Sequence, residues 1–248
     1  MTFLSLIVVF CASSVLFCSS TAMSTKTKVI VSGAAGRTGS LVLKKLLARE
    51  DFTPIGIVRT MKSGKKLIKQ LKLSADQMLE GDITDVDQLE KAIKASGAEK
   101  YVMCTSAVPK IKIWSLIVAI FMKIFGRKVR PEFYFLKNLD PYNVDWLGAK
   151  NQIDAAKKAG IQHFVFLSSM GGTDKENFLN TIGRVPENEL SGNILLWKRK
   201  AEQYLIESGM QYTILHPGGL IDKAGGERVV VGGINDELLK NEKRQIPR

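Results

Sequence analysis

Three glycines at a fixed spacing constrain the fold of this chain more than any other feature. They are Gly33, Gly36 and Gly39, and they stand between a β-branched run at 28–32 and a helix-forming stretch at 40–47. In a strand–turn–helix unit, the first glycine permits a sharp turn, the second lets the backbone approach a phosphate, and the third lets the helix pack closely on the strand. The helix start also offers unpaired N–H groups to an anion. The pattern predicts a dinucleotide-binding turn, with a purely structural turn in another α/β protein as the alternative.

Short apolar segments alternate with amphipathic segments along the rest of the chain. Hydrophobic strands separated by helices indicate a parallel sheet with right-handed crossovers. The predicted fold class is therefore α/β, a single doubly wound Rossmann-type domain over 23–248. Strands are predicted at 28–33, 54–59, 77–80, 100–105, 162–168 and 211–215, and helices at 38–49, 64–72, 85–96, 141–159 and 193–208.

The chain is strongly basic, with a formal net charge of +12 over 248 residues. Its lysines and arginines are scattered along predicted amphipathic helices instead of gathering with aromatic residues on one face, and no nucleic-acid recognition motif accompanies them. An anionic cofactor, an anionic membrane surface or simple solubility explains the excess. We therefore expect no nucleic-acid partner.

Residues 1–22 read as a signal or targeting segment. Residues 1–18 carry no charge, small residues follow at Ser20 and Ala22, and the uncharged run is short for a membrane span. A start at Met23 would suit a cytosolic protein, so a secretory signal, a targeting presequence and an upstream-extended gene model all stay open. Because Cys104 is the only later cysteine, no internal disulfide is expected. A plastid or other organelle, or the cytoplasm, is favoured over the secretory pathway.

The segment at 111–130 interrupts the alternation. Its uncharged part, 113–122, is too short to cross a bilayer, and its apolar residues surround the predicted helix, so we expect it to be buried or to lie against something apolar. Basic residues flank it on both sides, at Lys110 and at 127–130. Such flanks suit a helix at a membrane interface. The alternatives are a buried lid over the active cleft or a contact between subunits.

Arg59, at the end of the second predicted strand, bears on the choice of cofactor. An acidic residue at this place binds the ribose hydroxyls of NAD, whereas an arginine accommodates the 2′-phosphate of NADP. No Asp or Glu ends this strand, and Lys62, Lys65 and Lys66 follow it. Arg37, inside the glycine turn, can reach the same phosphate. NADP is therefore the expected cofactor, and a solvated arginine at a helix start is the simpler alternative for Arg59.

Two further strand ends carry candidate cofactor contacts. After the third strand, Asp82 and the backbone at Ile83 are placed to meet the adenine, while Thr84 or Asp85 caps the next helix. After the fourth strand, small residues line the place where the nicotinamide half would lie. These small residues are Thr105, Ser106 and Ala107.

Several motifs also occur in one characteristic order. They are Gly33 to Gly39, Val58-Arg59, Gly81 to Asp85, Thr105 to Lys110, Ser168 to Thr173, Asn193 to Glu202, Gly218-Gly219-Leu220 and Asp236 to Leu239. In this order they resemble the atypical short-chain dehydrogenases/reductases of the NmrA-like, plant and algal NAD(P)-binding group, from about residue 28 to the last. The resemblance implies a Rossmann fold with bound NADP. The residues that it implies around the cofactor are Gly33, Gly36, Arg37, Thr38, Gly39, Arg59, Asp82, Ile83, Thr105, Ser106, Ala107, Lys198, Pro217, Gly218, Gly219 and Leu220.

One departure from the family bears on catalysis. Ordinary family reductases use a Tyr-x-x-x-Lys pair, in which the lysine lowers the pKa of the tyrosine so that its hydroxyl transfers a proton. Aligned on Lys198, this chain has Ile194 in place of the tyrosine. The candidate catalytic residues are then Lys198, which would hold the nicotinamide ribose, and Ser169, which would bond a substrate carbonyl. Side chains that would replace the acid, if the fold brings one in, are Tyr142, Tyr134 and His216.

The end of the chain is a second departure, because family members continue beyond 246–248 with a helix and a strand. We expect the domain to lack that pair, and each Å² of apolar sheet so exposed would cost about 25 cal/mol. The two histidines and Cys104 lie too far apart in sequence for metal-ligand spacing, so no metal site is expected.

Two functions fit these observations. The first is an NADP-dependent oxidoreductase acting on a small carbonyl or enone, with 111–138 and 217–225 forming the substrate wall. The second is a non-catalytic NADP-binding regulator or scaffold that senses redox state, which the missing tyrosine favours. A membrane-surface accessory protein using 111–125 is a third interpretation. The substrate and the oligomeric state do not follow from the sequence.

Overall fold

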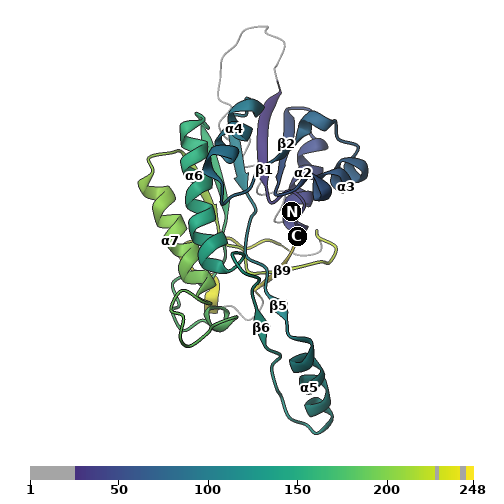
Figure 1. Cartoon of the computed structure of the whole chain (residues 1–248), viewed down its shortest axis with the longest axis vertical. Coiled ribbons are helices and arrows are strands. Elements are labelled where there is room, and N and C mark those ends of the chain that lie inside the picture. Colours follow the sequence, from purple (N-terminus) through teal and green to yellow (C-terminus); the bar gives the residue numbers. More distant parts are fainter. Residues whose placement is uncertain (1–25, 227–228, 241–243) are drawn as a thin grey trace.

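A six-stranded parallel sheet forms the centre of the part of the chain that the structure describes, residues 26–226, 229–240 and 244–248 of a computed structural model. Its strand order is β3-β2-β1-β4-β7-β8 (Figure 1). The segment predicted at 1–22 lies outside the described residues. Each strand coincides with one predicted from the alternation, and the doubly wound α/β class is confirmed. The strands are β1 (Thr27–Ser32), β2 (Phe52–Val58), β3 (Met78–Glu80), β4 (Lys100–Met103), β7 (His163–Leu167) and β8 (Tyr212–Leu215).

Helices cover both faces of the sheet. Successive strand residues point to opposite faces, so Val29 and Val31 pack with residues of α2 and α3, whereas Ile30 packs with residues of α4, α6 and α7. Each large aliphatic side chain fully buried in this way stabilises the fold by about 1.5–3 kcal/mol. The helices are α2 (Arg37–Leu47), α3 (Met61–Leu71), α4 (Val86–Ser96), α6 (Gly148–Lys158) and α7 (Ile194–Glu207), with short 3₁₀ turns η1 (Ala75–Gln77), η3 (Phe178–Thr181) and η4 (Glu237–Lys240).

The strand order reverses beside β1, and this reversal indicates where a ligand crevice would lie. The strand β1 pairs with β2 on one side and with β4 on the other, and the register brings Ser32 opposite Met103 at their carboxyl ends. In open α/β sheets, ligands bind outside the carboxyl ends of the strands at such a switch point. The glycine turn follows β1 at this edge, so the sequence prediction and the topology indicate the same place.

A π-helical segment, η2 (Tyr142–Leu147), precedes α6 where the sequence predicted one continuous helix over 141–159. Single π-helical turns inside α-helices are frequently found at functional sites. Here the segment carries a buried carboxylate, Asp145.

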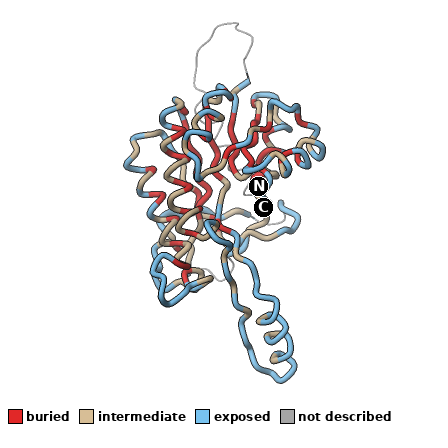
Figure 2. The backbone as a smooth tube through the Cα atoms, viewed as in Figure 1, coloured by how far each residue is buried: buried red, intermediate tan, exposed pale blue. Residues whose placement is uncertain are grey.

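Residues 110–134, which we call the arm, project from the domain as a hairpin (Figure 1). Its base is the antiparallel pair of β5 (Lys110–Ile111) and β6 (Phe133–Tyr134), and its far end carries α5 (Ile113–Ile124). The helix α5 contains no buried residue, and Figure 2 shows the arm in the colour of exposed residues almost throughout. The expectation that this segment is a buried lid was therefore wrong, because the hairpin carries the helix away from the sheet.

A second small sheet joins two segments near the end of the chain. The strand β9 (Gly219–Ile221) pairs in parallel with β10 (Gln245–Pro247), and the sequence predicted neither strand. Across 26–226, 229–240 and 244–248, none of the helices is both long and apolar enough to span a bilayer.

Candidate functional site

The glycine turn has the close contacts that its spacing predicts. Gly33 has a φ of +65°, in the left-handed region, and a Cβ there would lie 3.0 Å from the carbonyl of Cys104. A Cβ on Gly39 would lie 2.3 Å from the oxygen of Gly33, so only glycine lets α2 start this close to β1. The N–H of Gly36 donates to the same Gly33 oxygen at 2.8 Å. The turn is thus fixed by backbone contacts that any side chain at Gly39 would break.

The start of α2 is built to receive an anion. No side chain caps this helix, and no acidic residue stands in its first turn. Its first N–H groups, from Arg37 onward through Thr38, have no acceptor inside the helix, and the positive end of the helix dipole favours a phosphate here. The guanidinium of Arg37 is largely exposed and lies 3.7 Å from the carboxylate of Asp222, next to β9.

Arg59 is exposed one residue beyond β2, where the sequence places it beside a 2′-phosphate. An acidic side chain nevertheless approaches this edge from the neighbouring strand. Val58 is paired with Glu80 of β3, and the Glu80 carboxylate accepts the N–H of Met61 at 2.7 Å, at the start of α3. The pairing of β2 with β3 therefore brings the carboxylate of Glu80 to this edge, although the sequence of β2 alone has no acidic residue there.

The turn after β3 is fastened by its own side chains. The Asp82 carboxylate accepts the N–H of Thr84 at 2.9 Å and its hydroxyl at 2.8 Å. Asp85 is the N-cap of α4 and accepts the N–H of Gln88 at 3.0 Å, so the predicted cap is confirmed at Asp85. The carbonyl of Ile83 accepts the side-chain amide of Asn151, which ties this turn to α6.

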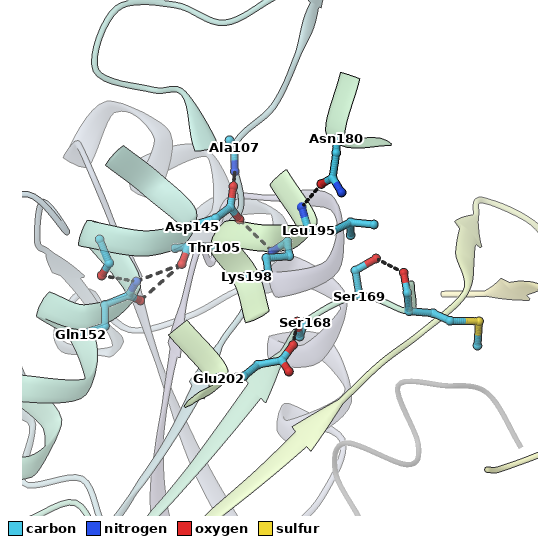
Figure 3. A network of polar contacts seen from close by, with 12 residues as sticks. Thr105, Ala107, Asp145, Gln152, Ser168, Ser169, Asn180, Leu195, Lys198 and Glu202 are labelled. Carbon is cyan, nitrogen blue, oxygen red and sulfur yellow. Dashed lines mark hydrogen bonds and ion pairs between the residues drawn. The ribbon is translucent and has the colours of Figure 1, made fainter. Parts of the chain in front are cut away.

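The segment after β4 is held by two polar side chains from the next helical stretch (Figure 3). The side-chain amide of Gln152 donates to the Thr105 hydroxyl at 3.0 Å, and its oxygen accepts the Tyr101 hydroxyl at 3.1 Å. The N–H of Ala107 donates to Asp145 at 3.1 Å, and Ser106 between them is exposed. These bonds fix the backbone beside the expected nicotinamide position.

Lys198 forms a buried ion pair that the sequence did not reveal. Its Nζ lies 2.7 Å from the second carboxylate oxygen of Asp145, and the two side chains are 7% and 0% exposed. Buried charges persist only when paired and hydrogen-bonded. Asp145 and Gln152 lie seven residues apart, which is two helical turns. Two polar residues on the otherwise apolar face of a helix were the sequence signal that could have indicated this buried polar network.

A second buried carboxylate, that of Glu202, lies on α7 one turn after Lys198. Glu202 accepts a hydrogen bond from the Ser168 hydroxyl, and its carboxylate lies 3.0 Å from His216 Nε2 and 2.5 Å from Arg199. Burial raises the pKa of Glu202, but hydrogen bonding and charge from His216, with help from Ser168 and Arg199, outweigh burial and leave the pKa below its usual value.

Ser169, unlike Ser168, is weakly engaged. Its hydroxyl donates only a long bond, 3.3 Å, to the carbonyl of Met170, and β7 and β4 end side by side, so it follows the strand next to Thr105. The turn that carries Ser169 is anchored by Asp236, which accepts the N–H groups of Gly171 and Thr173 at 3.0 and 3.1 Å. The pKa of Asp236 is lowered, because these bonds outweigh the effect of burial.

The Pro217–Leu220 stretch, predicted as a cofactor loop, is partly a strand. The Pro217 carbonyl accepts the N–H of Met170 at 3.0 Å, which joins it to the Ser169 turn. Gly219 and Leu220 belong to β9, and a Cβ on Gly218 would meet the Arg244 backbone at 1.8 Å. These glycines therefore serve the pairing of β9 with β10 in this structure.

The match to a known family covers most of the chain. Residues 33–248 match the model of a family described as NAD(P)H-binding. The chain belongs to this family. It is an atypical short-chain dehydrogenase/reductase, as its ordered motifs predicted, and it binds a nicotinamide dinucleotide, NAD(P).

Plant proteins are among the curated relatives. The chain is 46% identical over 221 residues to an uncharacterised chloroplastic protein of Arabidopsis thaliana, covering 89% of this chain and 61% of that protein. It is 43% identical over 236 residues to sanguinarine reductase of Eschscholzia californica, covering 91% and 81%. It is 28% identical to the chloroplastic protein TIC 62 of Arabidopsis thaliana over 77% of this chain and 27% of that protein. The chain thus spans about six-tenths of the length of the first of these relatives.

Solved structures share the fold at low sequence identity. A Bacillus halodurans protein described as a candidate NAD-dependent epimerase/dehydratase has a TM-score of 0.55 and 22% identity, over 80% of this chain and 73% of that one. An enzyme of Bordetella bronchiseptica in complex with NAD⁺ has a TM-score of 0.53 and 17% identity, over 80% and 58%. These likenesses concern the Rossmann-type fold.

The chain has Ile194 where a proton-donating tyrosine would stand, at the first position of α7. Of the candidate replacements, Tyr142 packs edge-on against Trp197 with ring centroids 5.0 Å apart, next to Lys198 in sequence. His216 is held on the Glu202 side of α7, and Tyr134 lies at the base of the arm. The fold therefore brings two of the three candidates against α7, Tyr142 at Trp197 and His216 at Glu202.

A cleft of about 710 Å³ lies where the base of the arm meets the loop before α7. Its walls combine aromatic and aliphatic side chains, among them Phe135, Phe178 and Leu190, with charged ones such as Arg130 and Asp140. Residues 130–137 contribute to it as expected, but α5 and the predicted 217–225 wall do not. The cleft reaches Tyr142 and Asn143 of the π-helical segment that carries Asp145, which places aromatic side chains next to the fixed polar network.

Lys198→Met is expected to destabilise the fold by about 3–5 kcal/mol, because it leaves Asp145 buried without its cation. The double variant Asp145→Asn/Lys198→Met should lose less than the sum of its two single variants. Urea unfolding of all three variants measures this, with Lys200→Met on the exposed face of the same helix as the control. Strict additivity of the two losses would refute the pairing.

The lowered pKa of Glu202 makes stability depend on pH in the acid range. The stabilising contribution of a carboxylate with a lowered folded pKa is complete above the usual value of 4.5 and disappears as pH falls through the folded value. Glu202→Gln should flatten the loss of unfolding free energy between about pH 5 and pH 3. Glu207→Gln, on the exposed side of α7, should keep the wild-type slope; equal slopes in all three proteins would contradict the assignment.

Proposed function

We propose that this chain is an NADP-dependent reductase of a small apolar carbonyl or enone compound. The observation that carries the proposal is the network at the carboxyl ends of β4 and β7, where Asp145 fixes both Lys198 and the backbone of Ala107. A chain that only needed to fold would gain nothing from burying this pair, since an apolar pair of similar volume is often as stable. A positioned ammonium group at a nicotinamide site has a use in binding and orienting the cofactor.

NADP is proposed over NAD on the basis of charge. Arg37 and Arg59 stand at the two ends of the expected adenosine site, both exposed, and the start of α2 has no acidic residue in its first turn. Glu80 counts against this choice, but its carboxylate is bonded to the N–H of Met61. Asp222, 3.7 Å from Arg37, is the second carboxylate near these cations, but both side chains of that pair are exposed, so their attraction is weak and Arg37 can turn to a phosphate.

Each residue then has a defined task. The N–H groups at the start of α2 bind the pyrophosphate, and Lys198, oriented by Asp145, bonds the hydroxyls of the nicotinamide ribose. When bound, the nicotinamide supplies the hydride that reduces the carbonyl or enone carbon. Ser169 donates a hydrogen bond to the substrate oxygen, because its own bond to Met170 is long and easily exchanged. With Ile194 at the tyrosine position, the proton comes from Ser169 with water resupplying it, or from Tyr142 at the cleft.

The cleft supports an apolar, ring-containing substrate. Aromatic side chains such as Phe135, Tyr142 and Phe178 line it, and stacked or edge-on contacts with such side chains favour flat ring systems. Sanguinarine reductase, 43% identical, aligns with 91% of this chain, so sanguinarine belongs in a substrate panel beside simple enones and quinones. Chloroplastic relatives support a plastid as the place of action.

A non-catalytic NADP-binding regulator is the second candidate, and Ile194 favours it. Isoleucine cannot transfer a proton, while every binding element named above is retained. Mass spectrometry of the nucleotide that co-purifies with the full chain, followed by NADPH absorbance across the substrate panel, separates the two candidates. Bound nucleotide without turnover of any compound would favour the regulator.

Arg59→Glu should weaken NADPH binding about 10- to 100-fold and leave NADH binding nearly unchanged. A lost charge-assisted hydrogen bond to a phosphate costs about 1.5–3 kcal/mol, and repulsion adds to it. Titration calorimetry with both cofactors measures the ratio, and Lys69→Glu at the far end of α3 controls for total charge. An unchanged preference would show that the 2′-phosphate is bound elsewhere.

Ser169→Ala should lower kcat/KM by about 10- to 100-fold with any substrate of the panel while the Kd for NADPH stays the same. The reason is that the hydroxyl bonds the substrate oxygen most strongly in the transition state and does not bind the cofactor. Stopped-flow and steady-state absorbance provide both quantities, and Ser208→Ala at the end of α7 is the control. Full activity in Ser169→Ala would eliminate this role.

A further inference from the structure

The exposed face of α5 is strongly apolar. Large side chains there include Trp114, 80% exposed, Ile124, 75%, and Phe121, 58%. At about 100° per residue, the exposed large apolar residues fall within an arc of about 200° of the helix surface. They are Ile113, Trp114, Leu116, Ile117, Val118, Ile120, Phe121, Ile124 and Phe125.

The opposite side of α5 faces the returning chain of the arm. Its half-buried positions are Ser115, Ala119 and Met122. The Ser115 hydroxyl accepts the N–H of Glu132 at 2.8 Å, and Lys112 forms a 2.8 Å ion pair with the Glu132 carboxylate. The hairpin is therefore closed by polar bonds at its base, and Trp114 and Val118, at one edge of the apolar arc, line a hollow with Val129 of the returning chain.

The charge around this arc is predominantly positive. Lys110, Lys112 and Lys123 stand on the first half of the arm, and Arg127, Lys128 and Arg130 follow in its turn, whereas Glu132 is the acidic residue in 110–134. An apolar arc bordered by cations is the pattern of a helix that lies in the headgroup region of an anionic membrane. Each lysine or arginine near such a surface raises partitioning by about fivefold.

We propose that the arm docks this protein onto an anionic lipid surface, with the apolar arc of α5 among the upper acyl chains and the basic residues at the headgroups. The helix has 12 residues and is about 18 Å long, too short to cross a bilayer, so it lies in the interface. A second copy of this chain is the weaker candidate for the arc, because two arms with the same basic charge would repel each other. The chain as a whole is also basic, at +12.

Vesicle flotation of the full chain tests the proposal. Vesicles of phosphatidylcholine with about one-third phosphatidylglycerol should retain at least about tenfold more protein than pure phosphatidylcholine vesicles, and high salt should reduce the difference. Trp114→Glu/Phe121→Glu should lower binding to the anionic vesicles to the level of the neutral ones. Arg127→Glu/Lys128→Glu should remove most of the preference for anionic vesicles, since each lost cation lowers partitioning by about fivefold. Val229→Glu, at a side chain 90% exposed outside the arm, should bind like the wild type.

All variants keep the same residues 1–22, so differences between them report on the arm. Equal flotation of wild type and Trp114→Glu/Phe121→Glu would overturn the proposal, as would the absence of any preference for anionic vesicles. A dimer seen by light scattering that dissociates in Trp114→Glu/Phe121→Glu, without vesicle binding in the wild type, would assign the arc to a second copy instead. Unchanged NADPH binding in each variant keeps this test separate from the proposed function.

Discussion

Asp145 is the residue on which the arrangement of the candidate site depends. One oxygen accepts the N–H of Ala107 after β4, and the other lies 2.7 Å from Lys198 of α7. A buried carboxylate persists only when its partners compensate its lost hydration, so the π-helical segment, the end of β4 and α7 must be in place together. Glu202 repeats this arrangement one turn later, where it joins α7 to Ser168 and His216. The helix α7 is thus held to the sheet on its buried face by two ionised groups as well as by its apolar side chains.

The parallel sheet could be predicted from the sequence because buried strands leave a strong local pattern. Runs such as 28–32 and 162–168 are apolar on both faces, as strands covered by helices on both sides must be. The turn at Gly33 could be predicted for the same reason, since its contacts join residues close in sequence. The pair of Asp145 and Lys198 joins residues 53 positions apart, and the π-helical turn that directs Asp145 inward depends on packing against α7. Glu80 beside Arg59 is a similar case, because only strand pairing brings it there.

The arm shows where composition alone misleads. Because 113–122 is uncharged, burial was the natural expectation, and the sequence did not show that β5 and β6 would pair and carry the helix away from the domain. Polar bonds at Ser115 and Lys112 hold that pairing, and both partner with Glu132. Because these polar bonds hold the hairpin together, the arm keeps its shape without packing its apolar side chains against the core. An exposed apolar surface of this kind on a folded domain generally marks an interaction site.

The substitution at Ile194 separates cofactor binding from proton transfer. In a Tyr-x-x-x-Lys pair, one lysine both binds the ribose and lowers the pKa of the tyrosine. Here Lys198 remains buried against Asp145, although the tyrosine that it would activate is absent. If the lysine served only to activate the tyrosine, it would have no role in this chain, yet burying its charge costs free energy. Under the proposed function, the retained pair orients the cofactor, and a catalytic acid would come from a group that the cleft or the Ser169 turn supplies.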